Sequence, residues 1–205
     1  MTIEAPALSA EAMAEWTSHV ESVLRGIAHA LNNRAAALSA LIELATEPAE
    51  EPPVIRSILG TELERVQGLV RVLRSIGVPR GAIEAFTPGD AAAEASSVLA
   101  LHSDHRDVPV EVDIAGAQPI RVQRWMFVRA VIALGAGMTR GPSRGPARLT
   151  ISAEDAWLEV IGTDTPWRTT PLVAELARAM GGDALPDRYG FRVPTLAALR
   201  QREGR

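Results

Sequence analysis

Residues 26–36 read GIAHALNNRAA and lie within a longer run, residues 9–46, in which apolar side chains recur at spacings of three and four. This period places the apolar positions on one face of an α-helix. They are Val20, Leu24, Ile27, Leu31, Leu38, Leu41, Ile42 and Ala45. The run predicts one long helix, which Ser9 can cap and which ends at the prolines of residues 46–53, TEPAEEPP.

A second helix is predicted from Pro52 to about Gly77, with prolines in its first turn and Pro79 beyond its end. Its apolar positions are Ile55, Ile58, Leu59, Val66, Leu69, Val70, Leu73 and Ile76. Two long helices joined by a short loop predict an antiparallel hairpin. Because such a hairpin leaves part of each apolar face in water, we expect two copies to pair as a homodimeric four-helix bundle.

After Gly81 the pattern changes to helices that alternate with short strands. The sequence predicts helices from Asp90 to about His105, over about 122–139 and over 171–180, and strands over 108–114, 147–153, 156–162 and within 189–196. Residues Glu154 and Asp155 are expected to form a tight turn. This mixture predicts an α/β sandwich with helices on one face of a mixed sheet. The expected fold class is α+β, with a hairpin domain at residues 1–80 and a sandwich domain at residues 81–205.

The composition excludes several kinds of chemistry. The 205-residue chain contains no cysteine, and all 21 of its basic residues are arginines, so thiolate, disulfide and lysine chemistry are excluded. The net charge of −4 provides no general attraction to nucleic acid. No apolar run is long enough to span a bilayer, and the amino terminus lacks the pattern of a signal peptide. We therefore expect a cytoplasmic protein that binds neither nucleic acid nor membrane.

His29 is the candidate nucleophile of the first helix. It lies two residues from both Ile27 and Leu31, off the centre of the apolar face, so its ring is expected to reach solvent. Such an imidazole is substantially neutral near pH 7, and a ring nitrogen can attack phosphorus. Asn33 lies one turn further and can hydrogen-bond a phosphoryl group or an attacking water. The alternative is a solvated histidine beside two surface asparagines.

The order of elements, together with AHALNN at residues 28–33, resembles the core of bacterial sensor histidine kinases over nearly the whole chain. In that family the hairpin dimerises, and its first helix carries a phosphoacceptor histidine in a segment reading His-Glu-Leu-Asn-Asn-Pro-Leu. His29 and residues 31–33 match this segment, whereas Ala30 replaces the acid and Arg34 replaces the proline. Because the acid helps the histidine to attack ATP, its absence argues against autophosphorylation.

The second half resembles the ATP-binding domain of that family without its nucleotide-binding motifs. The helix that supplies a magnesium-holding asparagine in the family reads WMFVRAVIALGAGM here, with Val131 and Gly135 at the expected polar positions. The adenine-recognising Asp-x-Gly-x-Gly motif corresponds to IGTDTPW, which keeps Asp164 and lacks the glycines. No glycine-rich phosphate loop precedes the helix that follows Thr169. The resemblance implies a degenerate nucleotide site and no cofactor.

A phosphotransfer hairpin followed by such a domain is similar to the dimeric histidine phosphotransferases of alphaproteobacterial phosphorelays. This likeness implies that His29 takes a phosphoryl group from a response-regulator receiver domain and passes it to another, with Asn33 assisting. The expected receiver-binding surface consists of Asn32, Arg34, Ala36, Ala37 and Ala40. Two alternatives stay open: a divergent kinase with residual ATP-dependent autophosphorylation, and a non-catalytic scaffold or phosphatase for a response regulator.

Three other groups of residues have simpler interpretations, and we expect no metal site. His102 and His105 lie beside two acids in LHSDHRD, but at a helix end, where a solvated loop is expected rather than a metal site. His19 is expected to be a helix-surface histidine. The arginine-rich residues 139–148 are expected to form a flexible connector.

Overall fold

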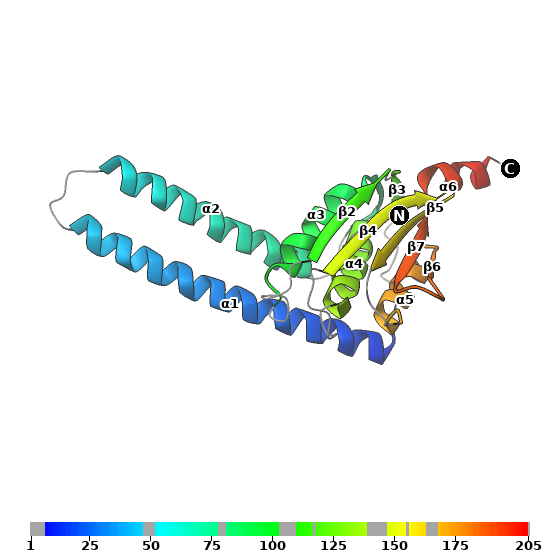
Figure 1. The fold of residues 1–205 in the computed structure, drawn as a ribbon, viewed down its shortest axis with the longest axis horizontal. Coiled ribbons are helices and arrows are strands. Elements are labelled where there is room, and N and C mark those ends of the chain that lie inside the picture. Colours follow the sequence, from blue (N-terminus) through cyan, green and yellow to red (C-terminus); the bar gives the residue numbers. More distant parts are fainter. Residues whose placement is uncertain are drawn as a thin grey trace.

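The computed structural model describes residues 7–46, 52–77, 81–102, 110–116, 118–138, 147–154, 156–162 and 168–204. A long helical hairpin projects from an α/β unit (Figure 1). Its helices are α1, Ala10–Thr46, and α2, Pro52–Ile76, which lie side by side and run in opposite directions. Both predicted helices are confirmed, and their pairing with a second copy stays a prediction.

Ser9 begins α1 as expected. Its hydroxyl accepts a hydrogen bond from the Ala12 backbone N–H at 3.2 Å, which satisfies one of the free donors of the first turn. The same hydroxyl donates to Glu175 at 2.6 Å. The start of α1 is therefore attached to a residue of the α/β unit far away in the sequence.

The α/β unit contains a mixed five-stranded sheet in the order β2-β4-β5-β7-β6. Its strands are β2, Val110–Ala115; β4, Ala147–Glu154; β5, Trp157–Gly162; β6, Asp183–Ala184; and β7, Gly190–Pro194. β2 and β4 are parallel, and the other neighbours are antiparallel. A separate antiparallel pair joins β1, Ile83–Phe86, to β3, Ile120–Gln123.

Three helices cover one face of this sheet: α3, Pro88–Leu99; α4, Arg124–Met138; and α5, Pro171–Ala179 (Figure 1). Burial alternates along β4 and β5, with Leu149, Ile151 and Val160 buried between less buried neighbours. Phe127 of α4 lies at the centre of the core, where its ring meets Phe86 and Phe191 edge-on at 5.9 Å. The predicted mixed α+β architecture with helices on one face is confirmed.

Some predicted boundaries are wrong, and four short elements were not predicted. α3 begins at Pro88 rather than Asp90, whose carboxylate instead accepts a hydrogen bond from the Thr87 hydroxyl at 2.7 Å. It ends at Leu99, and residues 103–109 lie outside the described residues. The strands β1, β3 and β6 have four, four and two residues, too few for a period to be recognised. The fourth element, α6, Leu196–Glu203, is mostly polar.

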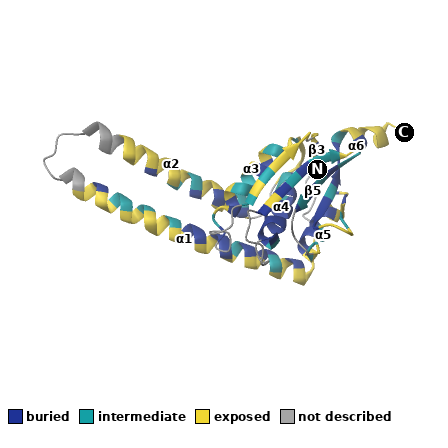
Figure 2. Ribbon diagram, viewed as in Figure 1, coloured by how far each residue is buried: buried dark blue, intermediate teal, exposed yellow. Residues whose placement is uncertain are grey.

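The amino-terminal half of α1 packs against the α/β unit, whereas most of the remaining hairpin is more exposed (Figure 2). Trp16, Val23 and Ile27 belong to the same hydrophobic cluster as the core of the sandwich.

The division into two domains between residues 80 and 81 stays a prediction. Along the described chain, no helix combines the length and apolarity needed to cross a membrane.

Candidate functional site

The apolar face predicted for α1 is divided into two stripes. Ile27 is 3% exposed and faces the interior, but Leu24 and Leu31 are 43% and 40% exposed. The buried stripe instead runs through Ala12, Trp16, Val23 and Ile27. Leu24 and Leu31 therefore lie outside the arc of α1 that packs within the protomer, since a helix that packs on one neighbour buries a narrower arc than its whole apolar face.

His29 lies on the solvent-exposed side of α1, as its spacing from Ile27 predicts. Its Nε2 atom is 3.1 Å from the Nδ2 atom of Asn33, one turn further along the helix. An amide nitrogen can only donate, so in this contact Nε2 is the unprotonated ring nitrogen and Nδ1 carries the proton. The lone pair of Nε2 accepts this hydrogen bond on the exposed side of the helix, so the Asn33 amide has to move away before Nε2 can act as a nucleophile.

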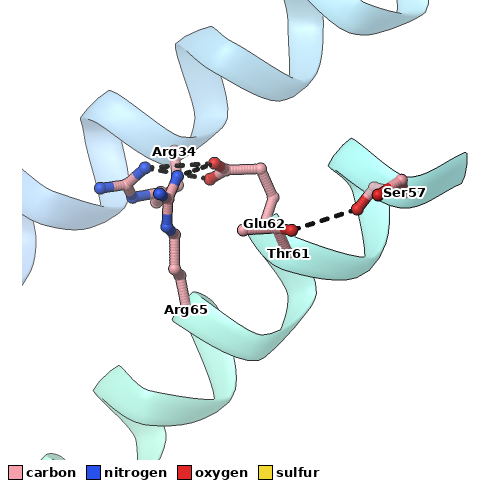
Figure 3. Close-up of polar contacts among 5 residues, drawn as sticks. All are labelled: Arg34, Ser57, Thr61, Glu62 and Arg65. Atoms are coloured by element: carbon pink, nitrogen blue, oxygen red, sulfur yellow. Dashed lines mark hydrogen bonds and ion pairs between the residues drawn. The ribbon is translucent and has the colours of Figure 1, made fainter. Parts of the chain in front are cut away.

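The residues expected at the receiver-binding surface do not all share one environment. Asn32, Ala36 and Ala40 are exposed, as is His29, whereas Ala37 is half-buried. Arg34 points into the hairpin, where its Nη1 atom lies 3.2 Å from both carboxylate oxygens of Glu62 on α2 (Figure 3). The partner-binding role of these residues stays a prediction, and for Arg34 it competes with this ion pair.

Glu62 is a buried carboxylate between two arginines. The guanidinium of Arg65, one turn further along α2, also donates to the Glu62 carboxylate (Figure 3). The neighbouring Thr61 hydroxyl donates instead to the Ser57 carbonyl at 3.1 Å. Burial alone raises the pKa of Glu62, but the hydrogen bonds from Arg65 and Arg34 outweigh it and hold this pKa below its usual range. The carboxylate therefore stays ionised near pH 7. Through Arg34 it links α2 to α1, one helical turn beyond Ala30.

At Gly26, three residues before His29, the backbone of α1 lies close to the α/β unit. A Cβ atom at this position would lie 1.6 Å from the carbonyl oxygen of Leu101, just after α3. Only a residue without a side chain permits such an approach between a helix and a foreign backbone. No pattern in the sequence predicts a role for this glycine.

His19 is 1% exposed, so its expected position on the helix surface is wrong. Its Nδ1 atom lies 3.4 Å from Nε2 of His102, which is also 1% exposed. The expectation that His102 belongs to a solvated loop is wrong as well, and His105 lies outside the described residues. His19 follows Trp16 by three residues and precedes Val23 by four, a spacing that places it on the buried face.

Glu15 completes this buried group, because its Oε1 atom lies 3.6 Å from Nε2 of His19. Its other carboxylate oxygen accepts a hydrogen bond from the Leu172 backbone N–H at the start of α5. Burial raises the pKa of Glu15, but the nearby His19 ring, Thr170 and the hydrogen bond from the Leu172 N–H outweigh it and lower the pKa. Among the described residues, no group of three metal-ligating side chains comes together, here or elsewhere.

The positions expected to be polar on α4 lie in the apolar core. Val131 is fully buried, and a Cβ atom on Gly135 would lie 2.6 Å from a methyl group of Leu99. Thr169 is engaged with the backbone of β7, since its hydroxyl donates to the Gly190 carbonyl at 2.9 Å and accepts from the Gly190 N–H at 3.1 Å. Asp164 and residues 139–146 lie outside the described residues. The described part of the predicted nucleotide region is therefore used for packing.

Arg129 of α4 is a junction residue that the sequence analysis did not identify. Its guanidinium lies 4.3 Å from the ring centre of Trp16 and 5.0 Å from that of Trp125. It also donates to the Gly77 carbonyl at the end of α2 at 2.9 Å. Burial lowers the pKa of Arg129 to about 10, so the side chain stays charged near pH 7 and joins both hairpin helices to the α/β unit.

The sequence matches no protein-family model and no curated protein. Among solved structures it is similar to the histidine kinase AdeS of Acinetobacter baumannii, with a TM-score of 0.39 and 18% identity over 82% of this chain and 96% of that one. A histidine kinase of Burkholderia phymatum gives a TM-score of 0.41 and 12% identity over 92% and 98% of the two chains. The cytoplasmic segment of histidine kinase QseC gives 0.41 and 13% over 74% and 99%. All three are histidine kinases, and scores this low assign neither family nor activity to this chain.

Proposed function

We propose that this chain is a histidine phosphotransfer protein of a two-component phosphorelay. His29 accepts a phosphoryl group from the phospho-aspartate of one receiver domain and donates it to the aspartate of another. The observation that carries the proposal is the exposed His29 ring, whose Nε2 atom lies 3.1 Å from the Asn33 amide on the outer side of a helical hairpin. The resemblance of residues 28–33 to a phosphoacceptor segment agrees with this geometry.

The chemistry needs little from this chain besides a positioned nucleophile. Nε2 of His29 attacks the phosphorus, the N–P bond forms, and the bond from phosphorus to the aspartate oxygen breaks, so the carboxylate is the leaving group. The ring, now positively charged, releases the Nδ1 proton to solvent. Asn33 moves its amide from Nε2 to a phosphoryl oxygen, where an N–H donor stabilises negative charge. The receiver supplies the magnesium ion and the acidic pocket in this scheme.

We further propose that the phosphoryl group does not come from ATP. In support, α4 carries no asparagine, and its residues Val131 and Gly135 are packed into the core. Ala30 follows His29, where a kinase of this type has an acid. Two measurements test this part: calorimetry with magnesium and ATP, and incubation with radiolabelled ATP. Saturable binding together with label transferred from ATP to His29 would make the chain a kinase.

Exposed apolar stripes on both hairpin helices support a homodimer. On α1 the stripe recurs with alternating spacings of four and three, the heptad pattern of packed helices. It consists of Leu24, Ala28, Leu31, Ala35, Leu38 and Ile42, and α2 adds Leu59, Leu63, Val66, Val70 and Leu73; Leu38 and Val66 are half-buried and the others are exposed. Since a monomer would leave these side chains in water, pairing of two hairpins provides the partner surface. His29 lies on another face of α1 and stays accessible in such a bundle.

The decisive experiment incubates the chain with receiver domains phosphorylated from radiolabelled acetyl phosphate. Wild type should acquire label that is acid-labile and base-stable, as expected for phosphohistidine, and His29→Gln should acquire none. Asn33→Ala should slow transfer, whereas Ser39→Ala is the control, because Ser39 is exposed on the same helix and is not among the residues expected to bind the receiver. Equal labelling of wild type and His29→Gln would remove His29 from the mechanism.

A further inference from the structure

A cavity of about 610 Å³ lies between α1, α2 and α3, where the hairpin meets the α/β unit. Its volume falls within the range of about 300 to 1,000 Å³ that is typical of small-molecule sites. Leu69, Val72 and Leu101 contribute apolar wall, and Ala30, the residue after His29, lies on the α1 side. The proposed phosphotransfer chemistry does not use this cavity.

Arginines give the lining a positive charge. Arg34, Arg65 and Arg71 all border the cavity. Arg34 and Arg65 share the single carboxylate of Glu62, and Arg71 is exposed and makes no ion pair with the residues that the structure describes. The acid that lines the cavity, Glu94, lies 3.1 Å from Arg124 and is neutralised by it. The cavity therefore combines an apolar wall with uncompensated positive charge.

We propose that this cavity binds a small amphipathic organic anion, with its carboxylate, sulfonate or phosphate group at Arg71 and Arg65 and its apolar body against Leu69, Val72 and Leu101. Arginine forms strong paired hydrogen bonds to such groups, and the walls exclude water from the apolar part. Because the lining comes from both hairpin helices and from α3, an occupant bridges the hairpin and the α/β unit directly beside the segment that carries His29. The site is a place at which a small molecule can control this junction.

The test uses two fluorescent probes with the same ring system. 8-Anilinonaphthalene-1-sulfonate carries an anionic group, and N-phenyl-1-naphthylamine is its neutral counterpart. Wild type should bind the sulfonate saturably, with a dissociation constant of about 1–100 μM, and should bind the neutral probe more weakly. No saturable binding of the sulfonate would overturn the proposal.

Two variants test the cavity and the charge separately. Gly68→Leu places a side chain in the cavity that Gly68 lines, its Cβ atom meets nothing closer than the Arg71 guanidinium at 3.9 Å, and leucine favours the helix. It should lower the affinity for both probes about tenfold or more, a loss typical of a displaced apolar group. Arg71→Gln should lower the affinity for the sulfonate about fivefold, as expected for the loss of one partly exposed ionic hydrogen bond. It should leave the affinity for the neutral probe unchanged.

Arg74→Gln is the matched control, since Arg74 is exposed on the same helix and does not line the cavity. It should leave both affinities unchanged. Sulfonate binding that survives Gly68→Leu would place the probe on the exposed apolar stripes of the hairpin and overturn the proposal. Equal loss of both probes in Arg71→Gln, or equal effects of Arg71→Gln and Arg74→Gln on the sulfonate, would overturn the assignment of the anionic group. Circular dichroism verifies that each variant is folded.

Discussion

Replacing Gly26 with alanine should destabilise the protein, although alanine is the better helix former. The added methyl would lie 1.6 Å from the Leu101 carbonyl oxygen, about 1.8 Å short of the 3.4 Å at which ordinary contacts begin. Neither backbone can rotate away, so α1 has to withdraw from the end of α3 and loosen the packing of Val23 and Ile27. Overpacking of this kind costs about 1–3 kcal/mol. An open helical site would instead gain about 1 kcal/mol from the same substitution.

Gly60 on α2 provides the matched control, because a Cβ atom there meets nothing within 4 Å. Gly60→Ala should therefore stabilise by up to about 1 kcal/mol, whereas at Gly26 the same gain only partly offsets the overpacking cost, so Gly26→Ala should destabilise by up to about 2 kcal/mol. In a chain of this size 1 kcal/mol shifts Tm by about 2–4 °C, so calorimetry should give shifts of opposite sign. If Gly26→Ala raised Tm as much as Gly60→Ala, α1 would not approach Leu101 as described.

Three further changes probe the junction and the proposed dimer. Glu15 has a lowered pKa in the folded state, so its stabilising effect is present above its unfolded value of 4.5 and is lost as pH falls through the lower folded value. Glu15→Gln should thus lower Tm at pH 7, and the difference from wild type should shrink below pH 4.5; a difference independent of pH would exclude this linkage. Leu63→Glu, in the exposed stripe, should give a monomer by light scattering at micromolar concentration, whereas Ser57→Glu, on another face of α2, should not; a monomeric wild type would refute the dimer. Arg129→Lys keeps the charge but loses the flat stacking on Trp16, and should cost about 1–2 kcal/mol in urea unfolding; unchanged stability would show that the stacking contributes nothing.

Long periodic segments allowed most of the fold to be predicted. The two hairpin helices, the strands β4 and β5 and the helix α5 were all expected close to their observed positions, because each contains enough residues to show its period. The strands β1 and β3 were missed, since four residues next to a helix show no clear alternation. The placement of α3 was imprecise because Asp90 is a plausible cap, yet Thr87 and Pro88 lie earlier in the chain and begin the helix.

The sequence by itself determined that His29 and Ile27 lie on different faces of α1, because the helical period separates residues that are two positions apart. It also determined that Asn33 lies one turn away, where its amide reaches the ring. Only the tertiary structure decided that His19 is buried, that Gly26 touches Leu101 and that Arg34 is paired with Glu62. The period of a helix determines which residues share a face. Which of these faces is covered depends on neighbours from distant parts of the chain. Here the α/β unit covers the first turns of α1, and α2 covers the same face further along.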